Sequence, residues 1–195
     1  AYLRNVITTL IEEHGFRFLK LDFLYGAAAR GRLWDPRYSP AERLKVGYDL
    51  IREAAGEEVI LLGCGSPLAQ GIGRVEAMRV GPDVAPFWFD SVRYYLTRDP
   101  HAASTYFAVR SAIHRPIMHR RLWLNDPDCL MLRDRDILMN ETERFTLAHV
   151  AVLTGALYFL SDRLDLISEE GWQQEERLRS IAARCAAGID PAPLA

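Results

Sequence analysis

The sequence predicts an α/β fold with parallel strands. Five short, mostly apolar segments alternate with segments of helical periodicity along the 195 residues. Parallel strands covered by helices on both faces have this continuous apolar character, whereas antiparallel strands usually alternate polar and apolar residues. Five strands fit an open doubly wound sheet or part of a (β/α)8 barrel. Because neither GxGxxG nor GxxxxGK[ST] follows the first strand, the nucleotide-binding form of the open sheet lacks its usual motif.

The first half of the chain contains two expected helices and three expected strands. Apolar residues at helical spacing define the first helix, which the pair His14-Gly15 ends. The second helix has Ser39 as its N-cap residue, a proline in its first turn and Gly56 as its stop. The strands are short apolar runs, and a Gly-Pro pair breaks the third. The expected elements are helix 1–14, strand 16–23, helix 40–55, strand 58–64 and strand 75–80.

The second half continues the same alternation. Residues 84–115 read as mostly helical with an interruption near Pro100, because the residue before a proline is pushed away from helical angles. The last helix has Ser168 as its N-cap residue and an acidic first turn. The proline-rich tail 188–195 reads as a linker toward a further domain, which leaves 1–187 as one domain. The other expected elements are strand 121–126, helix 140–154, strand 156–161 and helix 168–187.

The composition argues against several classes of partner. A formal net charge of −2 without blocks of like charge gives no electrostatic footprint for nucleic acid or anionic membrane. No apolar run approaches the ~18 residues that span a bilayer, so we expect no membrane partner. Three cysteines without zinc-type spacing predict no zinc site and free thiols, which indicate a reducing compartment such as the cytoplasm. Because the chain does not begin with methionine, we expect it to be part of a longer protein.

Polar and charged residues close the expected strands. Lys20 and Asp22 have the same parity in the first strand, so their side chains point to one face. The third strand delivers Arg79 and then Asp83. In parallel α/β folds the site lies at the carboxyl ends of the strands, and in a barrel these ends meet at one mouth. The other strand ends are Cys64-Gly65-Ser66 after the second strand, Asn125 to Asp128 after the fourth and Ser161 to Arg163 after the fifth.

Each of these features also has a purely structural interpretation. A Lys20–Asp22 ion pair would be costly to bury and would seldom add net stability. A loop salt bridge between Arg79 and Asp83 is a common arrangement, and Cys64 has the character of a small buried residue. An Asx-type turn is the ordinary role of aspartates that flank a proline, as Asp126 and Asp128 do.

The constellation is more specific than its members. Two carboxylates on separate strands, each close in sequence to a cation, are the pattern that glycoside cleavage requires. A neighbouring cation lowers the pKa of a carboxyl group, so Lys20 favours Asp22 as the ionised partner. Metal-assisted hydrolysis is the competing use of such aspartates, but it usually recruits histidine ligands. None of the five histidines lies at an expected strand end.

Four segments, in this order, resemble glycoside hydrolase family 36, the bacterial α-galactosidases or melibiases. They are FLKLDFLY, LLGCGSPL, MRVGPDVAPFW and WLNDPDCLMLR. The resemblance covers nearly the whole chain and implies a (β/α)8 TIM-barrel catalytic domain, of which this chain holds the last five strands and their helices. It also implies hydrolysis of terminal α-D-galactosyl residues with retention of configuration, without a cofactor. Two flanking β-domains and three barrel strands would lie outside the chain.

The resemblance also implies roles for individual residues. The KxD motif implies that Asp22 is the catalytic nucleophile and that Lys20 binds galactose hydroxyls. The RxxxD motif implies that Asp83 is the general acid/base, with Arg79 as a partner of sugar hydroxyls and carboxylate. The other implied substrate-binding residues are Cys64 and Gly65 in the pocket wall, Trp88 at the rim and Asp128 in a supporting position at the barrel mouth.

Three alternatives to an α-galactosidase stay open at this point. Two are enzymes of altered specificity, namely an α-N-acetylgalactosaminidase and a galactosyl transferase of the raffinose-synthase type. The third is a catalytically silent barrel fragment. Because open edges of a parallel sheet invite pairing, we expect either a homo-oligomer or the flanking β-domains as partners.

Overall fold

The computed structural model describes residues 2–29, 36–99, 102–154 and 156–187. The chain forms two compact units, Ala1–Arg79 and Val80–Ala195. The predicted linker 188–195 and the predicted helix break at Pro100 lie outside the described residues.

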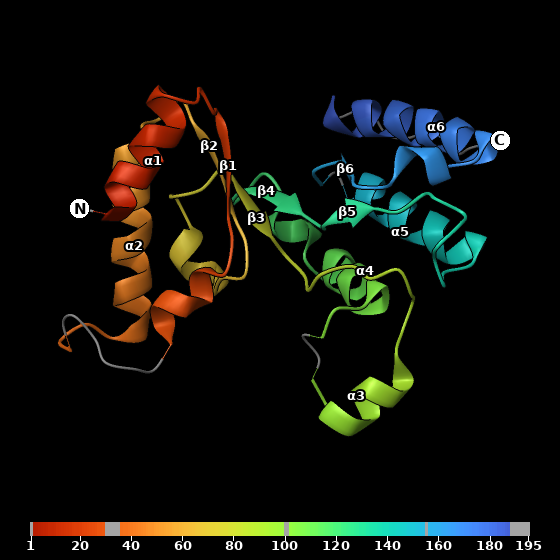
Figure 1. Ribbon diagram of the computed structural model, residues 1–195, viewed down its shortest axis with the longest axis horizontal. Helices are drawn as coiled ribbons and strands as arrows, with labels where there is room; N and C mark the ends of the chain where they lie inside the picture. Colours follow the sequence, from red (N-terminus) through yellow and green to blue (C-terminus); the bar gives the residue numbers. More distant parts are fainter. Residues whose placement is uncertain (1, 30–35, 100–101, 155, 188–195) are drawn as a thin grey trace. The chain divides into compact units, whose positions relative to one another are not determined.

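The first unit is a parallel sheet with helices on one side (Figure 1). Strand β1 pairs with β2, with Phe18 opposite Ile60, and β2 pairs with β3, with Leu62 opposite Ala77. Every helix and strand that the sequence predicts in this part is confirmed, although the strands are shorter than expected. The elements are α1 (Tyr2–Glu12), β1 (Phe18–Leu21), α2 (Pro40–Ala55), β2 (Ile60–Gly63) and β3 (Ala77–Arg79), with short 3₁₀ turns η1 (Leu24–Ala28) and η2 (Leu68–Gly71).

Helix α2 is held at both ends by side-chain hydrogen bonds. At its start, the Ser39 hydroxyl accepts from the Glu42 N–H at 3.3 Å and the Glu42 carboxylate accepts from the Ser39 N–H at 2.8 Å, a capping box. Near its end, Arg52 donates to the Glu76 carboxylate at 2.6 Å and to the Val59 carbonyl at 3.0 Å. These bonds tie α2 to the segments that enter β2 and β3.

The two faces of β1 differ in burial. Leu19 is 8% exposed, whereas Phe18 is 40% exposed and its neighbour Ile60 in β2 is 44% exposed. The prediction that the strands are buried on both faces is therefore wrong for β1. Helices α1 and α2 cover one side of the sheet, and the described residues leave the other side open at this strand (Figure 1).

Helices α5 and α6 of the second unit pack with a second parallel strand pair. Strand β5 pairs with β6, with Cys129 opposite Phe159. Leu130 from β5, Ala148 from α5 and Leu178 from α6 belong to one core cluster and are fully buried. The elements are α3 (Ser91–Thr97), α4 (Thr105–His114), η3 (Pro116–Met118), β4 (Leu124–Asp126), β5 (Cys129–Leu130), α5 (Glu141–Leu153), β6 (Phe159–Leu160), η4 (Leu164–Leu166) and α6 (Glu169–Ala186).

Strand β5 is absent from the sequence prediction, which ended the fourth strand at Asn125–Asp128. Proline lacks the N–H that a strand ladder needs, and Pro127 directly follows β4 (Leu124–Asp126). In the structure Asp128 has a left-handed φ of 82°, and the extended chain resumes at Cys129. The turn is therefore an interruption between two short strands.

The helical prediction for residues 84–115 is correct only in part. Helices α3 and α4 are present, but residues 84–90 are not helical. The backbone groups of this segment bond outside it, since the Pro86 carbonyl accepts from Leu138 and the Trp88 carbonyl accepts from Tyr106. Long-range partners therefore replace the local bonds of a helix.

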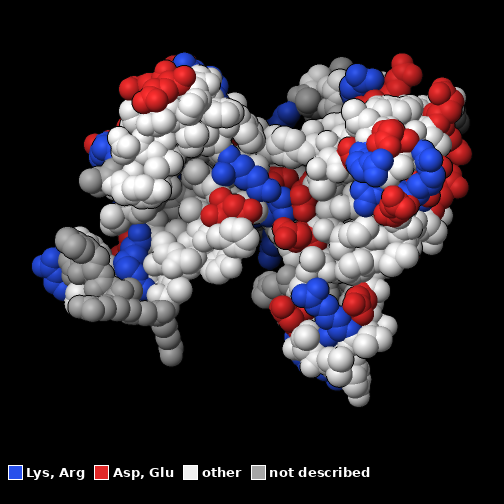
Figure 2. Space-filling view, viewed as in Figure 1, with Lys and Arg blue, Asp and Glu red and all other residues white. Residues whose placement is uncertain are grey.

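Charged side chains of both signs are mixed on the face of the molecule that Figure 2 shows. Figure 2 shows acidic and basic groups interspersed on the visible face, without a broad basic area. This distribution agrees with the formal net charge of −2 and offers no footprint for a polyanion on that face. Within the described ranges, no helix has the length and apolar character needed to cross a membrane.

Candidate functional site

Asp22 lies at a sharp turn directly after β1. The next residue, Phe23, has a left-handed φ of 53°, a conformation that costs free energy for any residue except glycine. This turn directs the Phe23 N–H back to the Asp22 carboxylate, at a distance of 2.7 Å. The backbone therefore holds the Asp22 carboxylate in one orientation at the carboxyl end of the strand.

The loop after β2 packs directly against this turn. The Cys64 N–H donates to the Leu21 carbonyl at 2.8 Å, and the Gly65 carbonyl accepts from Tyr25 at 2.7 Å. Gly65 has a φ of 52°, and a Cβ there would lie 3.4 Å from an Asp22 carboxylate oxygen and 3.3 Å from Phe23 Cα. Only glycine meets both conditions without strain, so the sequence GCG allows this close approach.

The electrostatic surroundings of Asp22 favour its anion. Partial burial raises its pKa, but the Phe23 N–H, the Cys64 thiol and the positive charges of Lys20 and Arg79 together lower the pKa below its ordinary value. Arg79 closes β3 and is buried, whereas Lys20 in β1 is exposed. The first unit thus brings together a carboxylate and two cations at the ends of parallel strands, as the shared parity of Lys20 and Asp22 predicts.

Cys64 acts as a hydrogen-bond donor in this arrangement. Burial raises the pKa of its thiol to about 11. The charge of Arg79 opposes this increase, and the hydrogen bond to Asp22 adds to it. A protonated thiol at neutral pH donates to a carboxylate and is a poor nucleophile. The structure therefore confirms that Cys64 is a buried residue and adds a hydrogen bond to Asp22, while its predicted place in a pocket wall stays a prediction.

Replacing Cys64 with alanine is expected to raise the pKa of Asp22, because a hydrogen bond to the charged form is lost. The pKa of Asp22 is lowered on folding, so its contribution to stability is present above the unfolded pKa and is lost as pH falls through the folded pKa. In Cys64→Ala this contribution to stability is smaller, and its loss is complete at a higher pH. A carboxyl ¹³C NMR titration of Asp22 measures the shift, and Cys185→Ala in α6 is the control. An unchanged titration in Cys64→Ala would show that the thiol does not influence the carboxylate.

Hydrogen bonds within the second unit fix the backbone at Asp83 and at the residue after it. The Asp83 carbonyl accepts from the Ser104 N–H at 2.9 Å, and the N–H of the next residue, Val84, donates to the Asp128 carboxylate at 2.9 Å. The Asp128 N–H donates in turn to the Asp126 carboxylate at 2.9 Å. Asp128 therefore positions the loop that carries Asp83, while its predicted contact with substrate stays a prediction. The Asp83 side chain is exposed.

The predicted site residues divide between the two units. Those of the first unit lie together around the turn after β1, and those of the second lie on the loops after β3 and β4. The first group is Lys20, Asp22, Cys64, Gly65 and Arg79, and the second is Asp83, Trp88 and Asp128.

Asp162 is a buried strand-end carboxylate to which the sequence analysis assigned no role. Its side chain is 0% exposed and accepts from the N–H groups of Leu132 and Arg133, the latter at 3.0 Å. The Arg133 guanidinium also donates to it, at 3.3 Å. A signal was present in the sequence, because Asp162 follows the last expected strand. These partners make it an anchor for the chain after β5.

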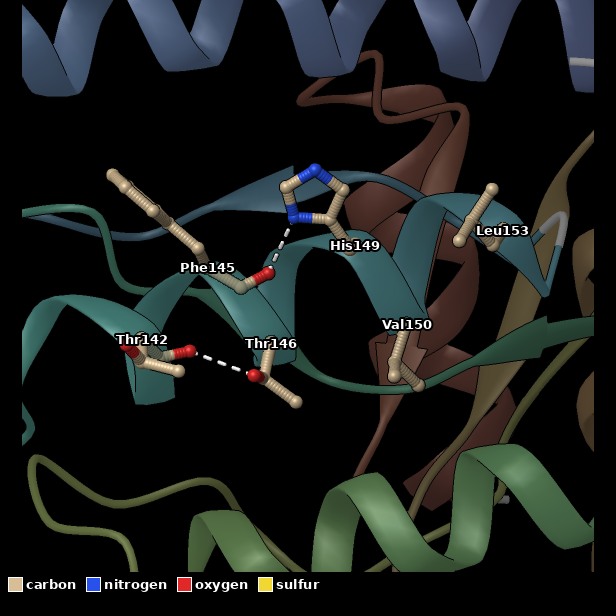
Figure 3. A pocket seen from close by; sticks show the side chains of 6 residues that line it. All are labelled: Thr142, Phe145, Thr146, His149, Val150 and Leu153. Atoms are coloured by element: carbon tan, nitrogen blue, oxygen red, sulfur yellow. Dashed lines mark hydrogen bonds between the residues drawn. The ribbon is translucent and has the colours of Figure 1, made fainter. Parts of the chain in front are cut away.

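Side chains of α5 line a depression of about 390 Å³ that has no charged group suited to catalysis (Figure 3). Its polar groups are bonded within the helix, since the Thr146 hydroxyl donates to the Thr142 carbonyl and a His149 ring nitrogen lies 2.7 Å from the Phe145 carbonyl. Among the described residues, no group of three or more His, Cys, Asp or Glu side chains could hold a metal ion.

The fold and the first-unit site define a class of protein. Parallel strands that end in a carboxylate and cations are typical of the (β/α)8 glycoside hydrolases, in which strand-end residues form the site. Comparison with solved structures supports the same class, because the structures that resemble this chain are TIM-barrel glycosidases. The predicted fold class is therefore confirmed.

Several of the similar structures are α-galactosidases. The α-galactosidase TtGalA from Thermus thermophilus, in complex with p-nitrophenyl α-D-galactopyranoside, is 32% identical with a TM-score of 0.77, over 93% of this chain and 35% of that one. Its stachyose complex gives 31% identity and a TM-score of 0.76, over 91% and 36%. α-Galactosidase I from Mortierella vinacea shares the fold at 17% identity and a TM-score of 0.72, over 97% and 48%.

These matches set the extent of the resemblance. The chain spans about a third of the length of the Thermus enzyme, and no protein-family model matches it. The resemblance to α-galactosidases that the four sequence segments predict is confirmed, and membership of family 36 stays a prediction.

Proposed function

We propose that this chain carries the nucleophile and the general acid/base of a retaining α-galactosidase, and that its substrate is a terminal α-D-galactoside. The observation that supports this most directly is the environment of Asp22. Its carboxylate accepts a hydrogen bond from the Phe23 N–H at 2.7 Å. This bond and the positive charges of Lys20 and Arg79 help to lower its pKa. An ionised, oriented carboxylate at a strand end is suited to attack on an anomeric carbon.

In the proposed first step, an Asp22 oxygen bonds to the anomeric carbon while the glycosidic bond breaks. Asp83, as the carboxylic acid, gives its proton to the departing oxygen. In the second step, the Asp83 carboxylate takes a proton from water, the water oxygen bonds to the anomeric carbon, and Asp22 departs. This route requires the two carboxyl groups to lie about 5 to 5.5 Å apart.

The other site residues have supporting roles in this proposal. Lys20 and Arg79 donate to galactose hydroxyls and keep Asp22 ionised. Gly65 leaves space beside the Asp22 oxygen, where a Cβ would lie at 3.4 Å. Asp128 holds the Val84 N–H and so fixes the backbone that carries Asp83.

The stereochemistry of azide rescue tests the two assignments. Asp22→Gly and Asp83→Ala are prepared in this chain and in a longer polypeptide that contains it. Each is incubated with p-nitrophenyl α-D-galactopyranoside and azide. Azide occupying the space of the nucleophile attacks from the β face, so Asp22→Gly is expected to yield β-galactosyl azide. In Asp83→Ala a galactosyl-enzyme still forms, and azide opens it to α-galactosyl azide.

The outcomes separate the proposal from its alternatives. Turnover of the unaltered protein together with the two opposite azide anomers supports both roles. If neither the chain nor a longer polypeptide hydrolyses the galactoside, the proposed function is wrong. If the protein prefers the matching N-acetylgalactosaminide, the proposed substrate is wrong and the α-N-acetylgalactosaminidase alternative is correct. If Asp22→Gly keeps its turnover without azide, Asp22 is not the nucleophile.

A further inference from the structure

The second unit contains an aromatic cavity of about 320 Å³, lined by residues of α3, of α4 and of the segment before α3. Its walls carry aromatic rings and one cation, and none of the lining residues is acidic. They are Trp88, Phe89, Tyr94, Tyr106, Phe107 and Arg110. This volume lies at the lower end of the roughly 300–1,000 Å³ typical of small-ligand sites.

The aromatic rings form an open wall. Phe89 is 38% exposed and Tyr106 is 40% exposed, and their ring centroids are 5.5 Å apart. Two of the lining residues are fixed by packing in the core. Phe107 is 6% exposed, and Trp88 packs against a core cluster that contains Ala108. Aromatic surface that is held rigidly but left open favours ligand binding over core packing.

The cavity wall is joined to the backbone of Asp83. Ser104 donates its N–H to the Asp83 carbonyl at 2.9 Å and its hydroxyl to the Trp88 carbonyl at 2.9 Å. The same Trp88 carbonyl accepts from the Tyr106 N–H at 2.9 Å. The proposed acid/base and the aromatic wall therefore belong to one hydrogen-bonded segment at the start of α4.

We propose that this cavity binds the pyranose ring of the leaving group, that is, the sugar released when the galactoside is cleaved. This rests on the proposed function, in which Asp83 protonates the oxygen of that sugar. A pyranose presents apolar C–H faces that stack on aromatic rings, and its hydroxyls accept from the planar donors of Arg110. Because none of the residues that line the cavity is acidic, the Arg110 guanidinium is suited to donate to a neutral ligand with many hydroxyl groups.

A comparison of two substrates tests the inference in the active polypeptide that contains this chain. α-Galactosyl fluoride has no leaving-group sugar, whereas an α-galactosyl-glucose disaccharide has one. Tyr106→Ala and Arg110→Ala are each expected to lower kcat/KM for the disaccharide by about 10-fold, because an aromatic contact or a charged hydrogen bond is lost. Neither variant is expected to change kcat/KM for the fluoride.

Tyr95→Ala and Arg98→Ala are matched controls. Tyr95 is 70% exposed on α3, Arg98 lies over its ring at 4.6 Å, and neither lines the cavity. Equal losses on both substrates in the cavity variants would indicate a general structural role and overturn the inference, as would no loss on the disaccharide.

A binding measurement separates this inference from the proposed function. If neither substrate is hydrolysed by the unaltered protein, the proposed function fails. Saturation-transfer NMR with methyl α-D-glucopyranoside then tests the cavity by itself. Binding that Tyr106→Ala abolishes and Tyr95→Ala retains supports the site, and no binding, or binding that Tyr106→Ala leaves intact, overturns it.

Discussion

Exchanging Asp22 for asparagine is expected to lower kcat/KM for p-nitrophenyl α-D-galactopyranoside by about 10⁴-fold or more. The amide has the shape of the carboxyl group, and its oxygen accepts from the Phe23 N–H in the same place, where the present bond is 2.7 Å. The fold is therefore retained. A neutral amide does not form the galactosyl ester, so the loss falls on chemistry. Steady-state kinetics and the thermal midpoint of the same preparation measure both effects.

Asp49→Asn is the matched control for this exchange. Asp49 lies on α2 in the same unit and also pairs with two cations, Arg74 at 2.5 Å and Lys45 at 3.5 Å. It is exposed and lies away from any strand end, so its exchange is expected to leave kcat/KM unchanged. Retention of activity within tenfold in Asp22→Asn would place the nucleophile elsewhere.

Replacing Asp162 with alanine is expected to lower the free energy of unfolding by about 3–5 kcal/mol. The carboxylate is fully buried and accepts from two backbone N–H groups and from the Arg133 guanidinium. Its removal leaves these donors without an acceptor and the largely buried Arg133 charge without its counter-ion. Urea unfolding followed by tryptophan fluorescence measures the change.

Two further variants test whether the loss of stability in Asp162→Ala comes from its buried hydrogen bonds. Asp165→Ala removes a carboxylate whose ion pair with Arg163 is about two-thirds exposed on both sides, and it is expected to change stability little. Asp162→Asn keeps one acceptor oxygen and is expected to fall between the unaltered protein and Asp162→Ala. If Asp162→Ala unfolds at the same urea concentration as Asp165→Ala, the buried bonds add nothing to stability.

The helices could be predicted because their signals are local. Ser39 with Glu42 and Asn140 with Glu143 form capping boxes at the predicted starts of α2 and α5. Ser168 caps α6 as predicted, its hydroxyl accepting from Gly171 at 3.3 Å. A cap and its partner lie three residues apart, so the printed sequence contains the whole interaction.

The first-unit site was predictable to the extent that it follows strand parity. Lys20 lies in β1 and Asp22 directly after it, two residues further on, and β2 and β3 bring Cys64 and Arg79 to the same end of the sheet. The left-handed turn at Phe23 was not predictable, because it depends on the neighbouring Gly65 loop.

The sequence by itself determined the alternation of helices and parallel strands, the helix ends and the charged residues at strand ends, because periodicity and capping act over a few neighbouring positions. Only the tertiary structure decided the interrupted strand at Asp128, the non-helical segment 84–90, the burial of Asp162 and the aromatic cavity. Each of these depends on hydrogen bonds or packing between residues distant along the chain. Such partners become neighbours only when the sheet and its helices have assembled.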